Sequence, residues 1–337
     1  MSTTRRCVLG TTATLVGALA LPAIGRAAGP EFVYKLGVDL PVSHPTAIWA
    51  QNAADRIKTE TGGRLEIQVF PNGALGSSTD MTSQVRSGAL EFLSQSGPVI
   101  SQLVPIAAIN TVGFAFKSED EVWRALDGDL GALIRGQIEN AGLVVMDKIW
   151  SLGFRQITTG TIPIRAPADL KGLKIRVPPG TIFISLFRAL NASPTSLNYN
   201  EMYVAMQNRV VDAQENPVGV LLAARLYEVQ KFLSLTNHMW AGYWMLANRR
   251  AFQALPADIQ ATASRILNES CLKQREQLAR EDNASLKQLG GNGMNINTTN
   301  PEDFRNALIE AGYYKEAKAR FGDASWAVLE KYTGPLG

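Results

Sequence analysis

Cysteine and histidine are scarce in this chain of 337 residues, which contains two of each. Cys7 lies in the N-terminal segment described below, so Cys271 has no partner and we expect no intrachain disulfide. Its apolar neighbours predict a buried structural thiol in a helix. His44 and His238 lie far apart, and neither has the closely spaced His or Cys neighbours of a zinc site. The sequence therefore predicts no metal site.

The sequence motifs of the common enzyme classes are also missing. The chain has no nucleophile elbow, no Walker loop and no dinucleotide-binding fingerprint. The glycines between Gly128 and Gly136 do not follow a phosphate-binding spacing. We therefore expect no catalytic residue and no cofactor. Because acidic side chains far apart in the sequence can still meet in space, a secreted enzyme stays open as an alternative.

Long apolar runs are absent except at the N-terminus. Arg5 and Arg6 precede an apolar run from Val8 to Ile24, and small residues follow at Ala27 and Ala28. This pattern is typical of a signal peptide, and the arginine pair resembles a twin-arginine signal. We predict that residues 1–28 are a signal peptide and that the rest of the chain is exported to the periplasm. An uncleaved membrane anchor is the alternative, because the interrupted run is ~17 residues long, near the lower limit for a span.

Beyond this segment the chain has no excess of charge of either sign. The sequence contains 33 basic and 30 acidic residues, and Arg5, Arg6 and Arg26 lie in the predicted signal peptide. The remainder is formally neutral, so the basic character belongs to the targeting segment. A nucleic-acid-binding surface needs clustered positive charge. We therefore expect no nucleic-acid partner.

Strands and helices alternate along the exported part of the chain. Alternating apolar residues or short apolar runs predict strands at residues 32–39, 65–69, 92–94, 143–146, 174–177 and 210–214. Apolar stripes with helical spacing, together with capping residues, predict helices near residues 45–61, 81–90, 118–126, 130–142, 183–190 and 200–207. This order indicates an α/β fold with a mainly parallel sheet.

A long helical pattern runs from Pro256 to Leu289, with proline in its first turn and Gly290-Gly291 after it. At ~1.5 Å per residue it would span about 50 Å, which is too long for one lobe. A chain of roughly 300 residues also exceeds the usual size of one hydrophobic core. We therefore expect two lobes, with the long helix bracing both.

Three segments carry polar side chains at the predicted strand ends. They are Gly153-Phe154-Arg155-Gln156-Ile157-Thr158-Thr159, Gly172-Leu173-Lys174-Ile175-Arg176-Val177-Pro178 and Asp212-Ala213-Gln214-Glu215-Asn216-Pro217. On the second segment, strand alternation places Arg176 on the face opposite Ile175 and Val177. Ligands of open α/β sheets usually lie beyond such strand ends.

These three segments, in this order, resemble the periplasmic receptors of TRAP (tripartite ATP-independent periplasmic) transporters. The resemblance covers nearly the whole chain after the predicted signal peptide. Further matching motifs are Thr61-Gly62-Gly63-Arg64, Phe70-Pro71-Asn72-Gly73, Asp169-Leu170-Lys171-Gly172-Leu173, Asn191-Ala192-Ser193-Pro194-Thr195, Tyr227-Glu228-Val229-Gln230-Lys231 and Thr236-Asn237-His238.

The resemblance implies a two-lobe periplasmic binding protein, type II-like, with hinge strands between its α/β lobes. We expect residues 29–152 and 241–281 to form lobe I, and residues 153–240 and 282–337 to form lobe II. The implied function is that of a monomeric receptor that closes on a small organic acid and delivers it to the membrane permease subunits of a TRAP transporter. A receptor for signalling or for another importer class remains an alternative.

The resemblance also implies ligand-binding residues in the second lobe. Arg176 would hold the ligand carboxylate, because the planar fork of a guanidinium matches two carboxylate oxygens. The alternative for Arg176 is a structural ion pair with an acid such as Asp212. Arg155 would be a second ligand-facing arginine or, alternatively, a hinge or surface salt bridge. Asn216 would hydrogen-bond the ligand, and Gln214, like its neighbour Glu215, would either do so or order the loop.

First-lobe strand ends would supply Asp39, Gln95 and Ser96. An acid at Asp39 suits a hydroxyl, an amine or a bound water better than a bare carboxylate. Among the aromatic residues near the predicted hinges, Phe154 and Trp240 would pack on an apolar ligand body or belong to the core; Trp150, Tyr243 and Trp244 lie in the same regions. We expect His238 to fix a loop, and His44 to cap a helix near the cleft.

Overall fold

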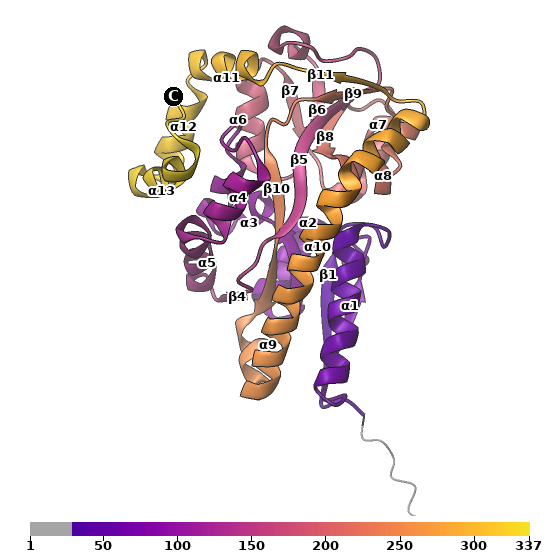
Figure 1. Cartoon of the computed structure of the whole chain (residues 1–337), viewed down its shortest axis with the longest axis vertical. Coiled ribbons are helices and arrows are strands. Elements are labelled where there is room, and N and C mark those ends of the chain that lie inside the picture. The colour runs from indigo at the N-terminus through magenta and orange to yellow at the C-terminus, as the bar shows by residue number, and fades with distance from the viewer. Residues whose placement is uncertain (1–28) are drawn as a thin grey trace, which may run out of the picture.

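A computed structural model describes residues 29–337 (Figure 1). The predicted signal peptide, residues 1–28, lies outside the described residues. Within the described range, none of the helices combines the length and the apolarity needed to span a bilayer.

The sheet of lobe I begins with three parallel strands, in the spatial order β2 (Leu65–Phe70), β1 (Phe32–Val38) and β3 (Phe92–Ser96). Helices α1 (Pro45–Glu60) and α2 (Ser78–Ser87) connect them. Strand β10 (Trp240–Asn248) pairs antiparallel with β3, and β4 (Leu143–Val145) pairs with β10. The predicted strands of this region are confirmed to within a few residues.

The sheet of lobe II is built on β5 (Trp150–Thr159) and β8 (Ala213–Pro217), which are antiparallel. Strand β6 (Lys174–Val177) lies parallel to β8 and to β7 (Ser193–Ser196). Strand β9 (Phe232–Leu235) pairs with β5 and with β11 (Asn295–Thr298). The helices of this lobe are α6 (Thr181–Ala189), α7 (Tyr199–Gln207) and α8 (Val218–Ala223).

The strand predicted at residues 210–214 begins later, at Ala213. The backbone N–H groups of Val210 and Val211 both donate to the carbonyl of Ala205, near the end of α7. Because these amides satisfy the last turn of a helix, they are not available to a strand ladder. The polar segment that follows is therefore the strand itself and not the loop beyond it.

Strands β5 and β10 connect the two lobes. They pair with each other, with Phe154 opposite Trp240 and Trp150 opposite Tyr243, and join both lobes into one sheet of order β2-β1-β3-β10-β5-β8-β6-β7. Figure 1 shows both strands passing through the centre of the molecule. The crossing contains a bulge at Ala241 and Gly242 and a positive φ of 92° at Gly153. These are the hinge strands expected from the resemblance.

Helix α10 (Ala257–Gly291) is 35 residues long and follows Pro256, close to the predicted bounds. It packs against α1 of lobe I and against α8 and β5, and Figure 1 shows it lying along both lobes. Its apolar residues up to Cys271 belong to the core of lobe I, whereas Leu289 belongs to a separate core in lobe II. The long helix therefore braces both lobes, as predicted.

The predicted buried thiol is confirmed at Cys271. Its Sγ donates to the carbonyl of Ile149 at 3.2 Å, and burial raises the pKa of this thiol to about 12.

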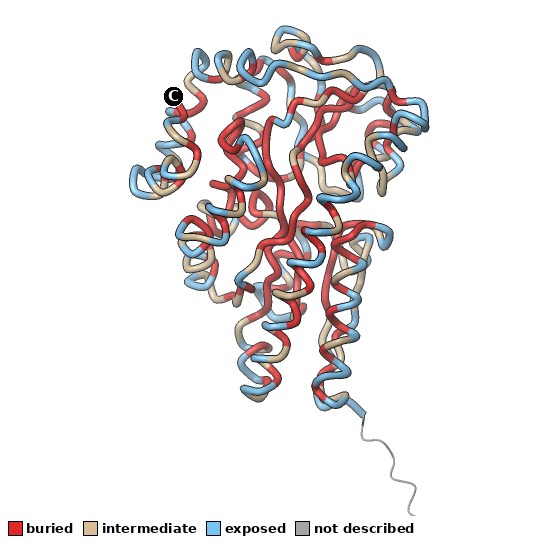
Figure 2. Tube along the Cα trace, viewed as in Figure 1, coloured by how far each residue is buried: buried red, intermediate tan, exposed pale blue. Residues whose placement is uncertain are grey.

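The largest apolar core extends across both lobes. Figure 2 shows that the strands at the centre of the molecule are buried. In lobe I this core includes residues of α2, α4 (Glu119–Leu126) and α5 (Asp129–Asn140). The C-terminal helices are α11 (Pro301–Glu310), α12 (Tyr313–Phe321) and α13 (Asp323–Thr333). Helices α11 and α12 contact α6, while α13 packs on α4 and α5. Because these helices contact both lobes, the assignment of residues 282–337 to lobe II stays a proposal.

Short helices complete the chain. They are α3 (Gly97–Ile100) and α9 (Arg249–Ala254), with 3₁₀ turns at Pro105–Thr111, Pro167–Leu170 and Leu226–Glu228. The turn at Pro105–Thr111 and helix α3 lie beside the site described next.

Candidate ligand-binding site

A cavity lies where the strand ends of both lobes meet. Lobe I and the hinge strands supply Asp39, Leu40, Ser78, Ser96, Pro98, Val99, Thr111, Leu152, Ala241, Gly242 and Tyr243. The second lobe, with the end of β5, supplies Arg155, Arg176, Pro178, Pro179, Phe183, Tyr199, Asn216 and Val220.

Arg176 reaches this cavity from β6 and is 1% exposed. Its Nε and Nη2 donate to the carbonyl of Leu197 at 2.9 and 2.7 Å, and its Nη1 lies 3.3 Å from Met202 Sδ. The alternative ion pair with Asp212 is not present, and no other acid in residues 29–337 forms a salt bridge with Arg176. Burial lowers the pKa of Arg176 to about 10, against the attraction of Glu215, so the side chain remains cationic at neutral pH.

Arg155, on β5, lines the same cavity but has an acidic partner. Its guanidinium is bound to the carboxylate of Glu215 through Nε and, at 2.8 Å, through Nη2, and both side chains are buried. Burial alone would raise the pKa of Glu215, but the charge of Arg155 and the hydrogen bond with His238 outweigh it, so this pKa is lowered. Arg155 is therefore part of a neutral pair and differs from Arg176 in this respect.

His238 holds the other side of the same carboxylate. Its Nε2 lies 3.1 Å from Glu215 Oε2, and its Nδ1 lies 2.7 Å from the hydroxyl of Thr236. The predicted loop-fixing role is confirmed, because both ring nitrogens bond to neighbouring protein groups.

Asn216 lines the cavity, whereas Gln214 lies behind it. Asn216 Oδ1 accepts from Arg155 Nη2 at 3.1 Å, and its Nδ2 donates to Gln214 Oε1 at 2.6 Å. Gln214 in turn donates to the hydroxyl of Thr158 at 2.7 Å. Gln214 does not line the cavity, and its side chain orients Asn216.

Asp39 and Ser96 line the cavity from the first lobe, and Gln95 does not. Asp39 Oδ2 accepts from Ser78 Oγ at 2.6 Å, and burial raises the pKa of Asp39 despite the hydrogen bonds of Ser78 and Tyr243 and the charge of Arg176. The side chain of Gln95 accepts from the Ser96 amide at 2.8 Å and donates to the carbonyl of Ser78 at 3.2 Å. Gln95 therefore does not line the cavity, contrary to expectation, but hydrogen-bonds to Ser78 and Ser96, which do line it.

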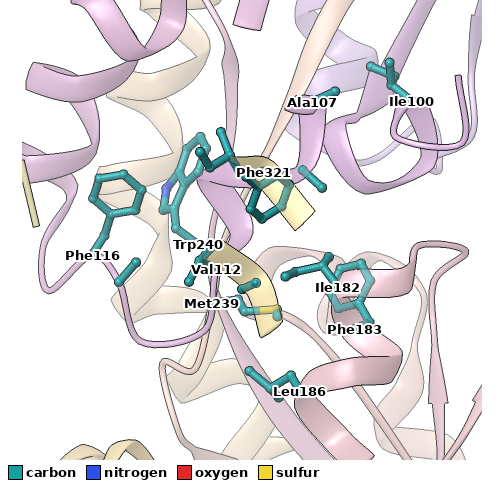
Figure 3. Close-up of a cluster of buried hydrophobic side chains, with 14 of the residues drawn as sticks. Ile100, Ala107, Val112, Phe116, Ile182, Phe183, Leu186, Met239, Trp240 and Phe321 are labelled. Carbon is teal, nitrogen blue, oxygen red and sulfur yellow. The ribbon is translucent and has the colours of Figure 1, made fainter. Parts of the chain in front are cut away.

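Phe154 and Trp240, the two aromatic residues proposed to pack on the ligand, do not line the cavity. On β5, Phe154 faces a second hollow shared with Phe114 and Phe116, because neighbouring residues of a strand point to opposite faces and Arg155 occupies the cavity side. Trp240 packs edge-to-face on Trp123, with ring centroids 5.4 Å apart. Figure 3 shows Trp240 within the buried core, so the core alternative holds for it.

Three comparisons place this arrangement among known proteins. Residues 36–318 match the family described as "Bacterial extracellular solute-binding protein, family 7". The chain belongs to this family.

The 2,3-diketo-L-gulonate-binding periplasmic protein YiaO of Escherichia coli (strain K12) is 30% identical to this chain over 264 residues, which cover 78% of this chain and 80% of that protein. The sugar acid binding protein DctPAm from Advenella mimigardefordensis, in complex with galactonate, has a TM-score of 0.86 at 26% identity and covers 90% of this chain and 98% of its own. A TRAP periplasmic solute binding protein from Roseobacter denitrificans with bound β-D-glucuronate has a TM-score of 0.85 at 27% identity, with 90% and 99% covered.

The protein is thus a TRAP-type solute-binding receptor of the periplasm, and its family consists of receptors and not of enzymes. The two-lobe fold with the ligand cavity between the lobes agrees with that class. Within residues 29–337, no group of three or more His, Cys, Asp or Glu side chains is arranged to hold a metal ion.

Sequence reasoning missed several residues that line the cavity of this family member, notably Ser78, Thr111, Phe183 and Tyr199. Ser78 and Tyr199 are the first residues of α2 and α7 and directly follow the N-cap residues Ser77 and Asn198. The capping patterns Ser77-x-x-Asp80 and Asn198-x-x-Glu201 are visible in the sequence and predict helix starts at these points. A capping pattern that follows a strand end was therefore the sequence signal that could have identified Ser78 and Tyr199 as cavity residues.

Proposed function

We propose that this receptor binds a small organic carboxylate between its two lobes and delivers it to the membrane permease subunits of a TRAP transporter for uptake. The observation that carries the proposal is the guanidinium of Arg176, which is buried in the cavity and forms no salt bridge within the described part of the chain. An uncompensated buried charge is costly, and a carboxylate supplies both the counter-charge and two acceptors for the guanidinium fork.

The other proposed ligand contacts follow from their positions around Arg176. Asn216 presents its amide to the cavity in an orientation fixed by Arg155 and Gln214. Arg155 lines the cavity, but its fork is already bound to Glu215, so it is not the primary anchor. Asp39 and Ser96 would contact the part of the ligand that lies opposite its carboxylate.

The relatives support the same ligand class. The ligands named for the three similar proteins, a diketogulonate, galactonate and glucuronate, are all organic acids. Delivery to a TRAP permease is supported by the TRAP assignment of the Roseobacter protein.

We also propose that the ligand is released chemically unchanged. Neither His44, His238 nor Cys271 lines the cavity, and a hydrolytic or transfer reaction usually needs a nucleophile, a base and an orienting group in mutual contact. The family of receptors to which the chain belongs supports the same reading.

A ligand screen tests the proposal directly. Organic acids are first ranked by the rise in melting temperature that they cause, because a ligand that binds only the folded state stabilises it by mass action. Titration calorimetry then gives the dissociation constant, and NMR of the recovered ligand shows whether it has changed. We expect one or more carboxylates to bind with a 1:1 stoichiometry and to be recovered intact. Stabilisation by neutral sugars and by no acid would refute the proposal.

A further inference from the structure

A second hollow lies beside the hinge, on the side of β5 that is turned away from the ligand cavity. It is lined by Phe114, Phe116, Lys117, Phe154, Asn237, Pro301, Glu302 and Arg305. Its position follows from strand alternation, since Phe154 points to the face opposite Arg155. Phe154 is partly exposed, and its ring takes no part in the ligand cavity. The aromatic surface of this hollow is therefore not explained by the site described above.

Hydrogen bonds and stacking hold the walls of this hollow in place. The Phe114 amide donates to the carbonyl of His238 at 2.7 Å, and the Phe114 ring stacks on Phe304 of α11 with centroids 6.0 Å apart. Asn237 exchanges two hydrogen bonds with the Gln156 side chain, at 2.5 and 3.0 Å. Phe114 and Asn237 have positive φ angles of 52° and 44°, which the surrounding contacts enforce. The hollow is therefore preformed, as ligand sites usually are.

Two cations belong to the lining. Lys117, in the segment before α4, is exposed, and Arg305, on α11, is half-buried. Arg305 Nη2 donates to the carbonyl of Pro335 at 2.7 Å, which is a neutral partner. Neither cation forms a salt bridge with an acid of residues 29–337. Because Glu302 is the one acid among the described lining residues, positive charge is in excess beside the aromatic surface.

We propose that this hollow is a second binding site, which takes a small amphipathic anion with an aromatic body and one anionic group. The aromatic body packs on the ring of Phe154, where aromatic contacts add to the burial of apolar surface. The anionic group lies between Lys117 and Arg305, which donate charge-assisted hydrogen bonds. The site shares no lining residue with the cavity that contains Arg176, so this inference does not depend on the proposed function.

Other classes of small molecule fit this hollow less well. A neutral aromatic molecule covers the rings but leaves both cations without a counter-charge. A small anion without an apolar body leaves the aromatic surface in contact with water. An aromatic cation is repelled by Lys117 and Arg305, and the second charge of a dianion is repelled by Glu302.

The test uses benzenesulfonate and three matched probes. Benzenesulfonamide is neutral, benzylammonium is cationic, and methanesulfonate lacks the ring. Calorimetric titrations are made with the Arg176→Ala variant, because its ligand cavity has lost the anion anchor. We expect benzenesulfonate to bind this variant about fivefold or more tightly than each of the other probes, since contacts to two cations add to the burial of the ring. A crystal structure of the unmodified protein with benzenesulfonate should show the probe on Phe154.

Two further substitutions in the Arg176→Ala background assign the binding to the hollow. Lys117→Gln and Arg305→Gln each remove one charge from its lining. Each is expected to weaken benzenesulfonate binding about threefold, as for a partly exposed ion pair, and to leave benzenesulfonamide binding unchanged. Lys315→Gln removes an exposed lysine of α12 that does not line the hollow, and as the matched control it should change neither affinity. Melting temperatures of the unliganded variants verify that each has folded.

The outcomes separate this inference from the proposed function. If benzenesulfonate binds neither protein, or if the crystal structure shows it only at Arg176, the second site is wrong and the carboxylate receptor stands. A sulfonamide that binds as tightly as the sulfonate, or an unchanged affinity in both glutamine variants, also overturns the site. If instead benzenesulfonate binds at the hollow while no organic acid binds in the ligand screen, this inference stands and only the proposed function fails.

Discussion

Arg155 and Glu215 form a buried ion pair between the adjacent strands β5 and β8, with both side chains almost completely shielded from solvent. His238 and the carbonyl of Glu215 complete the hydrogen bonding around this pair. The pair balances one of the two arginine charges in the cavity. The other, on Arg176, remains to be balanced by a ligand.

Glu215→Gln is expected to destabilise the fold. Removing one partner of a buried pair leaves the other charge uncompensated, which costs about 3–5 kcal/mol. The free energy of unfolding in urea measures the effect. The control is Glu276→Gln, which removes an exposed carboxylate from an ion pair with Lys273 on α10 and should leave stability nearly unchanged.

Arg176→Ala is expected to reduce the affinity for the acid identified in the screen by about 2–5 kcal/mol, as for a truncated buried charge pair. Arg176→Lys should recover only part of this loss, because an ammonium lacks the planar fork of donors. Calorimetry measures both. Arg188→Ala removes an exposed arginine of α6 that does not line the cavity, and it should bind like the unmodified protein. If the Arg176→Ala and Arg188→Ala variants bind the acid with equal affinity, Arg176 is not the anchor.

The burial of His44 leads us to expect weaker ligand binding at low pH. His44 caps α1, because its Nδ1 accepts a hydrogen bond from the Thr46 amide at 3.1 Å. Its Nε2 lies close to Gly219 of α8, at 3.7 Å from the position that a Cβ atom on this glycine would occupy. The ring is therefore buried between the first lobe and a helix of the second. Burial alone lowers the pKa of His44 from 6.5 to about 3, with no contribution from a charged neighbour.

The sign of this effect follows from linkage. The described structure buries the ring and therefore favours its neutral form. We expect the lobes to open for ligand entry and to expose the ring, which would then bind a proton below about pH 6.5. Ligand affinity should therefore be full above about pH 7 and fall by up to about tenfold per unit between pH 6 and pH 4. His44→Asn retains a capping side chain and removes the titration. Calorimetry at several pH values should show a shallower decline for this variant, and identical profiles would contradict the role of His44.

Cys271 is expected to resist thiol reagents while the protein is folded. Its pKa of about 12 leaves almost no thiolate at neutral pH, and the thiolate is the reactive species. Labelling with a disulfide reagent should occur only after unfolding in urea, so its rate reports on unfolding. Rapid labelling of the folded protein at pH 7.5 would show that the thiol is accessible.

Regular elements with a strong apolar pattern could be predicted from the sequence, because their periodicity directly reflects which face is buried. The long helix was placed to within two residues, and Arg176 was correctly placed on a strand with its side chain away from Ile175 and Val177. The family resemblance then correctly identified two lobes with a cavity between them.

The individual cavity residues were harder to predict. Strand alternation separates Phe154 from Arg155 and Gln95 from Ser96, so each neighbouring pair could supply only one cavity side chain. Gln214 and Asn216 lie on the same face of β8, and only their positions along the strand decide that Asn216 lines the cavity and Gln214 does not. The sequence does not reveal how far along the strand the cavity begins. The position of Tyr199 at the cavity depends on the hydrogen bond between Arg176 and the carbonyl of Leu197. This bond joins two separate segments, and no local sequence pattern encodes it.

The shared strands β5 and β10 also determine the order in which the protein can fold. Lobe I completes its sheet only when β10, ending at Asn248, pairs with β3, which ends at Ser96. Lobe II likewise needs β11, ending at Thr298, beside β9. Pairing between such distant segments slows folding. The nascent chain therefore cannot finish the first lobe before beginning the second, and neither lobe is an independent module that truncation could isolate.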